Sequence, residues 1–309
     1  MIQLLFHSLK KLFIIFLITS TLILTTASCN QNQTSNNNRD IIIASKDFTE
    51  QDILGELIAQ QIETTTNLKV ERKPRLGGSF ICHEALIKGA IDGYIEYTGT
   101  AFTSILKQPV INDPKQVYQL LKQGYAQKFN LEVMEPLGFE NTFAMIIRGE
   151  DAKKYNIKTL SEAAKYTPQW RGGFGYEFTE REDGFPGLAK TYNLKFRERP
   201  STMSLDLIYR ALTQRLVDMV AGNSTDGQIS RLGLVVLEDD KKYFPPYEAV
   251  PIFSRETLQK YPQLSPAISQ LAGKITADEI RQLNYLVEGE LRDVKEVVSE
   301  FRQTKNLKG

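Results

Sequence analysis

The chain has 309 residues, of which 41% are hydrophobic and 24% are charged, and its formal net charge is +1. This near-neutral balance provides no strong positive field, so nucleic acid is not expected as a partner. The length is sufficient for a large hydrophobic core and predicts two domains.

The first 28 residues have the features of an export signal in the usual order. Lys10 and Lys11 precede an apolar stretch from Leu12 to Leu24, too short to span a bilayer, and small residues precede Cys29. This junction resembles a bacterial lipobox, with Thr26 where an apolar residue is more usual. We expect Cys29 to become a lipidated N-terminus. The alternative is an ordinary cleaved signal followed by an incidental cysteine.

Residues 29–39 are polar and lack apolar periodicity, so we expect a flexible tether behind the lipidated cysteine. Without the signal, 36 basic and 37 acidic residues remain, a net charge of −1, and Cys82 is the only other cysteine. An intrachain disulfide framework is therefore excluded. The expected product is an exported protein held at an extracytoplasmic membrane surface by its anchor.

From residue 40 onward, short β-branched runs alternate with amphipathic stretches. Strands are predicted over 40–45, 68–73, 90–97, 141–148, 171–178, 216–222, 232–239 and 247–254. Helices are predicted over 49–64, 76–89, 113–129, 159–167, 183–193, 204–215, 265–275, 276–291 and 293–304. Thr49 is expected to cap the first helix, and Pro114 lies in the first turn of the third.

This alternation predicts α/β architecture with parallel sheets. The middle of the chain forms a second α/β unit inserted into the first, with strands near residues 142 and 250 crossing between them. Small-molecule clefts favour such junctions and the carboxyl ends of strands.

Residues for conventional catalysis are scarce. Outside the signal there is one histidine, His83, beside Cys82 on a predicted helix. Adjacent helical side chains point about 100° apart, so a Cys–His dyad is not expected, and a half-buried helix pair is the simpler interpretation. The motifs HExxH, GxSxG, GxxxxGK[ST] and CxxC do not occur. We expect no enzyme, metal site or cofactor.

Aromatic residues at predicted loop positions suggest a binding site. Tyr97 lies in "EYTGT", Phe143 in "ENTFAM" and Tyr247 in "FPPYEA". Each ring alone is explained by core packing, but rings gathered around one pocket attract a quaternary ammonium, by roughly 0.5–2 kcal/mol each. In "EYTGT", Gly99 is expected to let the backbone turn.

Arg181 precedes a predicted glycine- and proline-containing turn in "REDGFPGL". An arginine there can hold a carboxylate with two hydrogen bonds. The simpler alternative is a surface arginine paired with Glu182 or Asp183.

Seven stretches together resemble the extracytoplasmic substrate-binding proteins of ABC importers for glycine betaine, choline and carnitine. They are "ASKDFTEQDILGELIA", "LGGSF", "DGYIEYTGTAFTSILK", "PLGFENTFAM", "REDGFPGLAKTYNL", "NSTDGQI" and "KKYFPPYEAVP", in that family's order. The resemblance extends from Ile41 to about Ser299. It implies a bilobed, type II periplasmic-binding-protein fold, with two α/β lobes joined by two crossover strands. Lobe I would comprise residues 40–143 and 249–309, and lobe II residues 144–248.

The resemblance also implies roles for individual residues. Tyr97, Phe143 and Tyr247 would be walls of an aromatic cage. Lys46, Thr100 and Arg181 would hold a carboxylate, and Asn141 would add a polar contact.

Two positions depart from the family pattern, which commonly has tyrosine where this chain has Phe143 and Asn223. Phe143 keeps the aromatic face. Asn223 replaces a ring by an amide, which an N–H-bearing or hydroxylated solute could use.

The implied function is high-affinity binding of a quaternary-ammonium or related compatible solute by a monomer and delivery to an ABC permease. Three alternatives remain: a different cationic or zwitterionic solute such as an amino acid derivative, a secreted enzyme on the same scaffold, and a sensory receptor without a transporter.

Overall fold

The computed structural model describes residues 41–307. The predicted signal, Cys29 and the tether lie outside the described residues. Within them, no helix has the length and apolar character needed to cross a membrane.

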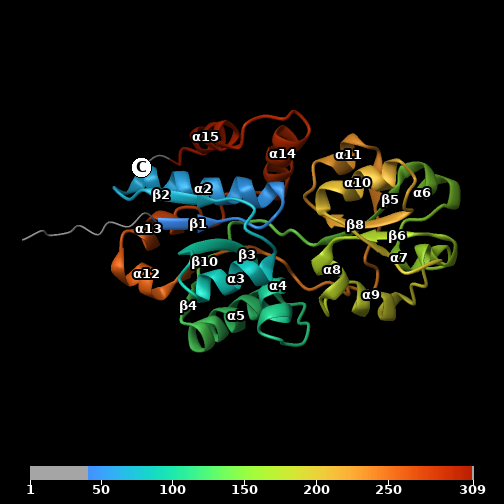
Figure 1. The fold of residues 1–309 in the computed structure, drawn as a ribbon, viewed down its shortest axis with the longest axis horizontal. Coiled ribbons are helices and arrows are strands. Elements are labelled where there is room, and N and C mark those ends of the chain that lie inside the picture. The colour runs from blue at the N-terminus through green and yellow to red at the C-terminus, as the bar shows by residue number, and fades with distance from the viewer. Residues whose placement is uncertain (1–40, 308–309) are drawn as a thin grey trace, which may run out of the picture. The chain divides into compact units, whose positions relative to one another are not determined.

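Two five-stranded sheets organise the described chain (Figure 1). The first has the order β2-β1-β3-β10-β4. Its strands are β1 (Ile41–Ala44), β2 (Val70–Lys73), β3 (Gly93–Tyr97), β4 (Leu131–Val133) and β10 (Ala249–Ser254). The second has the order β7-β6-β8-β5-β9. Its strands are β5 (Phe143–Arg148), β6 (Gly172–Phe174), β7 (Ser201–Thr202), β8 (Met219–Asn223) and β9 (Leu234–Val236).

Both sheets are mixed, so the expectation of parallel sheets is wrong for two strands. β10 is antiparallel to β3 and β4, and β5 is antiparallel to β8 and β9. Parallel pairing normally follows a helical crossover that returns to the same sheet. β5 and β10 instead follow segments that arrive from the other sheet, so that rule does not fix their direction.

The helices of the first and last thirds of the chain follow the strands of the first sheet. They are α2 (Thr49–Thr65), α3 (Ser79–Ile87), α4 (Thr98–Thr100), a π-helical turn (Ala101–Ile105), α5 (Pro114–Phe129), α12 (Arg255–Lys260), α13 (Leu264–Ser269), α14 (Ala277–Glu288) and α15 (Val294–Thr304).

The middle of the chain contributes shorter helices. They are α6 (Gly149–Tyr155), α7 (Leu160–Ala163), a 3-10 turn (Thr167–Gln169), α8 (Tyr176–Glu180), α9 (Phe185–Tyr192), α10 (Leu205–Thr213) and α11 (Gln228–Arg231). The strand predicted over 171–178 is wrong in its second half, because the chain leaves β6 at Gly175, which is the N-cap of α8. Several short elements have no counterpart in the sequence prediction: β4, β7, α4, α6, α11, α12 and the π-helical turn.

The cap predicted for the first helix is also wrong. α2 begins at Thr49 itself, so the N-cap residue is Phe48, which has no capping side chain. The expectation for Pro114 is confirmed, because it is the first residue of α5, and the Asp113 carboxylate accepts from the Gln116 N–H at 3.0 Å.

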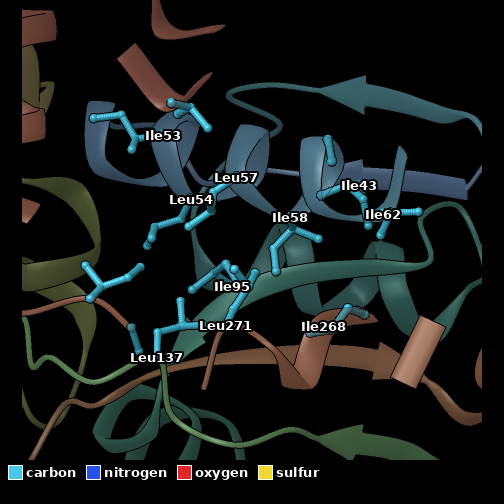
Figure 2. Close-up of a cluster of buried hydrophobic side chains, with 14 of the residues drawn as sticks. Ile43, Ile53, Leu54, Leu57, Ile58, Ile62, Ile95, Leu137, Ile268 and Leu271 are labelled. Carbon is cyan, nitrogen blue, oxygen red and sulfur yellow. The ribbon is translucent and has the colours of Figure 1, made fainter. Parts of the chain in front are cut away.

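α2 is buried on almost all sides. Figure 2 shows its Ile53, Leu54, Leu57, Ile58 and Ile62 among apolar side chains from β3, the segment after β4 and α13. α13, α14 and α15 also contact this helix. A helix buried in this way has little room for charge, which makes its few buried polar residues informative.

Two segments, 134–142 and 237–248, connect the sheets and pair with each other. Glu140 and Glu248 form an antiparallel bridge, and the Asn141 N–H donates to the Tyr247 carbonyl at 3.0 Å. The crossing region therefore contains two of the predicted site residues.

Candidate functional site

All eight predicted solute-binding residues line one cavity of about 470 Å³. They are Lys46, Tyr97, Thr100, Asn141, Phe143, Arg181, Asn223 and Tyr247. Residues attached to both sheets contribute to its wall. That they bind a ligand stays a prediction.

Strand ends place these side chains together. Tyr97 is the last residue of β3, Phe143 the first of β5 and Asn223 the last of β8. Phe143 and Asn223 are direct cross-strand partners, so their side chains share one face of the second sheet. The cavity thus lies at strand ends, where α/β proteins commonly bind ligands.

Lys46 is buried beside Tyr97. Its ammonium lies 4.3 Å from the centre of the Tyr97 ring, forms an ion pair with Glu96, and lies 3.3 Å from the Ser79 hydroxyl. The side chain of Glu96 is fully buried. The positive charge of Lys46 is therefore compensated inside the protein.

Arg181 is compensated in the same way, and is not the surface residue of the simpler interpretation. Its side chain is 3% exposed, and its Nε and Nη2 donate to Asp183 at 2.9 and 2.6 Å. Nη2 also donates to the Thr100 hydroxyl at 3.0 Å, and the guanidinium lies 4.9 Å from the centre of the Phe143 ring.

Asp183 links Arg181 to the crossing region. It accepts from the Tyr247 hydroxyl at 2.7 Å and from the Ser104 hydroxyl at 2.9 Å. Burial opposes its charge, but Arg181 and the Tyr247 hydroxyl outweigh burial and hold the pKa of Asp183 below its usual value. One carboxylate thus positions both a cation and an aromatic wall.

Sequence reasoning missed further cavity residues. Phe48 stacks on Tyr97 with ring centres 6.5 Å apart, and Phe178 packs on Phe143 at 4.7 Å. Glu177 also lines the cavity, 3.8 Å from Arg181 Nη1, and burial raises its pKa despite that guanidinium. The sequence did contain a signal for the two rings. Phe48 lies in "SKDF" close to Lys46, and Phe178 lies in "GYEFTER" close to Arg181.

Behind the cavity lies another missed residue, Glu50 in the first turn of α2. It is 2% exposed and accepts four hydrogen bonds from uncharged side chains. Oε1 accepts from the Tyr97 hydroxyl at 2.5 Å and the Asn141 amide at 2.8 Å. Oε2 accepts from the Thr225 hydroxyl at 2.5 Å and the Asn284 amide at 3.0 Å. In the part of the chain described, no Lys or Arg pairs with it.

Asp226 has a similar place behind Asn223. It accepts from the Asn223 backbone N–H at 2.9 Å, from the Asn223 amide at 3.3 Å, and from the Tyr209 hydroxyl. Burial, with smaller contributions from Glu288 and Glu50, raises the pKa of Asp226 to about 7.

Gly99 has a different role from the predicted turn. The chain does not turn there but continues from β3 into α4 and the π-helical turn. A Cβ at position 99 would lie 2.7 Å from the Pro246 carbonyl oxygen and 2.7 Å from Tyr247 ring atoms. Glycine is required because the wall residue Tyr247 packs directly on this backbone.

Cys82 and His83 lie outside the cavity wall. Burial raises the pKa of the Cys82 thiol to about 12, and burial lowers the pKa of His83, whose ring packs edge-on against Phe129 at 4.7 Å. These are properties of core residues. Across residues 41–307, no group of three or more His, Cys, Asp or Glu side chains could hold a metal ion.

Comparison with known proteins adds to this geometry. Residues 39–304 match a family model described as the substrate binding domain of ABC-type glycine betaine transport systems. The chain belongs to this family.

Individual relatives are similar over most of the chain. The carnitine transport binding protein OpuCC of Listeria monocytogenes is 36% identical over 96% of this chain and 96% of its own length. The ergothioneine transport permease/ergothioneine binding protein EgtU of Helicobacter pylori strain G27 is 36% identical over 87% of this chain, which spans 48% of that protein.

A crystal structure of a glycine betaine/carnitine/choline ABC transporter protein is 34% identical, with a TM-score of 0.71 over 87% of this chain and 99% of that one. The predicted bilobed, type II α/β fold is confirmed.

The raised pKa of Asp226 predicts an unusual pH dependence of stability. The folded-state pKa lies above the value of about 3.9 expected for an unfolded chain, so the folded protein binds this proton more tightly. The contribution of Asp226 to stability is therefore favourable at acid pH and is lost as pH rises from about 4 to about 7. As the pH rises from 5 to 8, the melting temperature of the Asp226→Asn variant should therefore increase relative to that of the natural protein.

Asp218→Asn is the matched control. Hydrogen bonds from Arg171 and Arg148 outweigh burial and hold the pKa of Asp218 below its usual value, so its effect should be constant from pH 5 to pH 8. Melting curves of the three proteins in that range test this. If the melting temperatures of Asp226→Asn and the natural protein differed by the same amount at every pH, the raised pKa of Asp226 would be contradicted.

Two glycine substitutions should change the free energy of unfolding in opposite directions. Gly99→Ala places a Cβ against backbone and a buried ring, and should cost about 1–3 kcal/mol of unfolding free energy. Gly55→Ala, inside α2, meets its nearest atom at 3.4 Å and should gain up to about 1 kcal/mol from helix propensity. Urea unfolding measures both, and equal effects would be inconsistent with the close approach at Gly99.

Proposed function

We propose that the protein captures a small cationic compatible solute in this cavity and delivers it to an ABC importer permease. The observation that carries the proposal is the meeting of Tyr97, Phe143 and Tyr247 at one cavity of about 470 Å³. Aromatic faces attract a cation without needing a proton donor, which suits a permanently charged ammonium head.

Further rings support a cage centred on Phe143. Phe178 and Tyr247, which also line the cavity, lie 4.7 and 5.9 Å from it, measured between ring centres. Asn223, opposite Phe143 on β8, takes the place that the family resemblance gives to another ring. We therefore propose a cage with aromatic walls and an amide in one side.

An anionic end of the solute would lie near Arg181 and Thr100. Asp183 engages Nε and Nη2 of Arg181, while Nη1 has only Glu177 nearby, at 3.8 Å, beyond hydrogen-bond distance. Nη1 is therefore available to a carboxylate, and Lys46, whose charge Glu96 compensates, lies in the same wall.

We further propose that residues 40–143 with 249–309 form lobe I and residues 144–248 form lobe II. Sheet membership supports this division, although Phe143 itself pairs within the second sheet. Bonds from Arg181 to Thr100 and from Ser104 to Asp183 would then join the lobes around a solute, as in hinge closure. Export as a monomer with a lipid on Cys29 would hold the protein near its permease.

A second solute class is favoured by one observation. The amide of Asn223 lines the cavity where an aromatic ring would suit a fully methylated head. A relative of 36% identity is named as an ergothioneine binding protein, so a betaine with an N–H-bearing ring is a reasonable second candidate. The family consists of substrate-binding proteins, so we do not propose the secreted enzyme, and the sensory receptor differs from the transporter component only in its partner.

A thermal-shift screen tests the proposal. Betaine, choline, carnitine, proline betaine, ectoine, ergothioneine and amino acids would be added to the protein, and a binder at 100 times its Kd stabilises the fold by about 2.7 kcal/mol. Phe143→Ala should weaken the best binder about tenfold or more, because it removes the central ring.

Tyr155→Ala is the control for this substitution. Tyr155 packs on Tyr166 at 4.8 Å and lies outside the cavity wall, so its loss should leave affinity unchanged. Unchanged affinity in Phe143→Ala, or no binder in the whole screen, would refute the cage.

A further inference from the structure

We infer that Thr225 is a positioning residue that links closure of the proposed lobes to the cavity wall, through a hydrogen bond to Glu50 that forms only when the lobes are closed. The inference rests on the proposed function, because it concerns the closed arrangement that holds a solute. Neither Thr225 nor Glu50 lines the cavity. The contact therefore raises the affinity for every solute that the cavity accepts, without selecting among them.

Thr225 belongs to a segment, residues 225–228, that follows β8 and is fastened to the second sheet. Asp226 accepts from the backbone N–H of Asn223, the last residue of β8, at 2.9 Å, and from the hydroxyl of Tyr209 in α10. Both bonds are internal to proposed lobe II. We therefore expect the segment to move with β8 when that lobe rotates.

The other side of the contact is formed by proposed lobe I. Glu50 lies in the first turn of α2, and Asn284 lies in α14, which contacts α2. The Thr225 hydroxyl donates to Glu50 Oε2 at 2.5 Å. The Asn284 amide donates to the same carboxylate oxygen at 3.0 Å and to the Thr225 carbonyl at 2.9 Å. All three residues are at most 2% exposed, so these bonds between the lobes are shielded from water.

A close backbone approach belongs to the same contact. A Cβ on Gly227 would lie 2.7 Å from the backbone nitrogen of Tyr285 in α14. Glycine permits this approach because it has no side chain to stand between the two backbones. The stretch "NSTDGQI" therefore contributes more than the wall residue Asn223, since its threonine and glycine dock the segment on lobe I.

Glu50 carries the effect of this contact to the cavity. Its Oε1 accepts from the Tyr97 hydroxyl and the Asn141 amide, and both of these residues line the cavity. One carboxylate is thus shared by two wall residues and by the segment of lobe II. Opening of the lobes would take the Thr225 donor away from a buried charge, which is unfavourable. The bond therefore stabilises the closed arrangement.

The apparent affinity of a solute depends on how much of the protein is closed. For a solute that binds the closed arrangement, the apparent Kd is the intrinsic Kd divided by the closed fraction. A contact outside the cavity changes that fraction and leaves the solute's own contacts unaltered. Its loss should weaken all solutes by one common factor, whereas a change in the wall alters the ratio between solutes.

Thr225→Val tests the inference, because valine has a similar shape and lacks the hydroxyl. Calorimetric titration with glycine betaine, choline and carnitine should show each measurable Kd raised about tenfold, the size expected for a hydrogen bond to a charged group. The ratios between the Kd values should stay as they are in the natural protein. Thr225→Ser keeps the hydroxyl and should retain the natural affinity.

Thr257→Val is the matched control. The Thr257 hydroxyl donates to the Asp92 carboxylate at 2.6 Å, and both side chains are buried outside the cavity wall. Both residues belong to proposed lobe I, so this variant removes the same kind of bond without affecting closure. It should lower the melting temperature about as much as Thr225→Val does and leave every Kd unchanged.

The outcomes separate the inference from the proposed function. Unchanged Kd values in Thr225→Val, or an equal loss of affinity in Thr257→Val, would overturn the inference and leave the proposed function standing. A loss confined to one solute would also overturn it. Asn284→Ala removes the bond to the Thr225 carbonyl and should likewise raise every Kd by a common factor, which keeps the test available if Thr225→Val does not fold. A natural protein that binds none of the three probes would count against the proposed function and the inference together.

Discussion

The Glu50 carboxylate connects more parts of this structure than any other group discussed above. Its partners come from β3, the crossing segment before β5, the loop after β8 and α14, while Glu50 itself lies in the first turn of α2. A buried charge without a counter-ion is costly, and here four neutral donors replace its hydration shell. Because those donors lie on separate elements, the carboxylate can be satisfied only when all of them are in place.

The same solution recurs around the cavity. Glu96 compensates Lys46 and Asp183 compensates Arg181, and the side chains of both acids are fully buried. Four of the predicted wall residues are thus each held by a carboxylate that does not line the cavity: Lys46, Arg181, Asn141 and Asn223. Such a wall can keep its shape without a ligand, which reduces the ordering that binding would otherwise require.

Much of this organisation could be predicted from sequence, and the remainder could not, for physical reasons. Periodicity located the long helices, and ordered motifs brought eight residues to one cavity. Glu50 was missed because an acidic residue in a first helical turn is normally explained by the helix dipole. The role of Gly99 was missed because a close approach by Tyr247, some 150 positions away in the chain, leaves no local signal. The direction of β5 and β10 depends on which sheet the chain arrives from, which alternation of strands and helices does not encode.

The crossing segments explain why binding and movement would be coupled in the proposed two-lobed receptor. Asn141 and Tyr247 are cavity residues, yet the backbones of these two residues hydrogen-bond to each other where the chain passes between the sheets. Any rotation of one sheet relative to the other must alter dihedral angles in or beside these segments, and so must move wall residues. A solute that contacts Asn141 and Tyr247 therefore has a different interaction energy in each arrangement. That difference is the physical requirement for a ligand to shift the population towards closure.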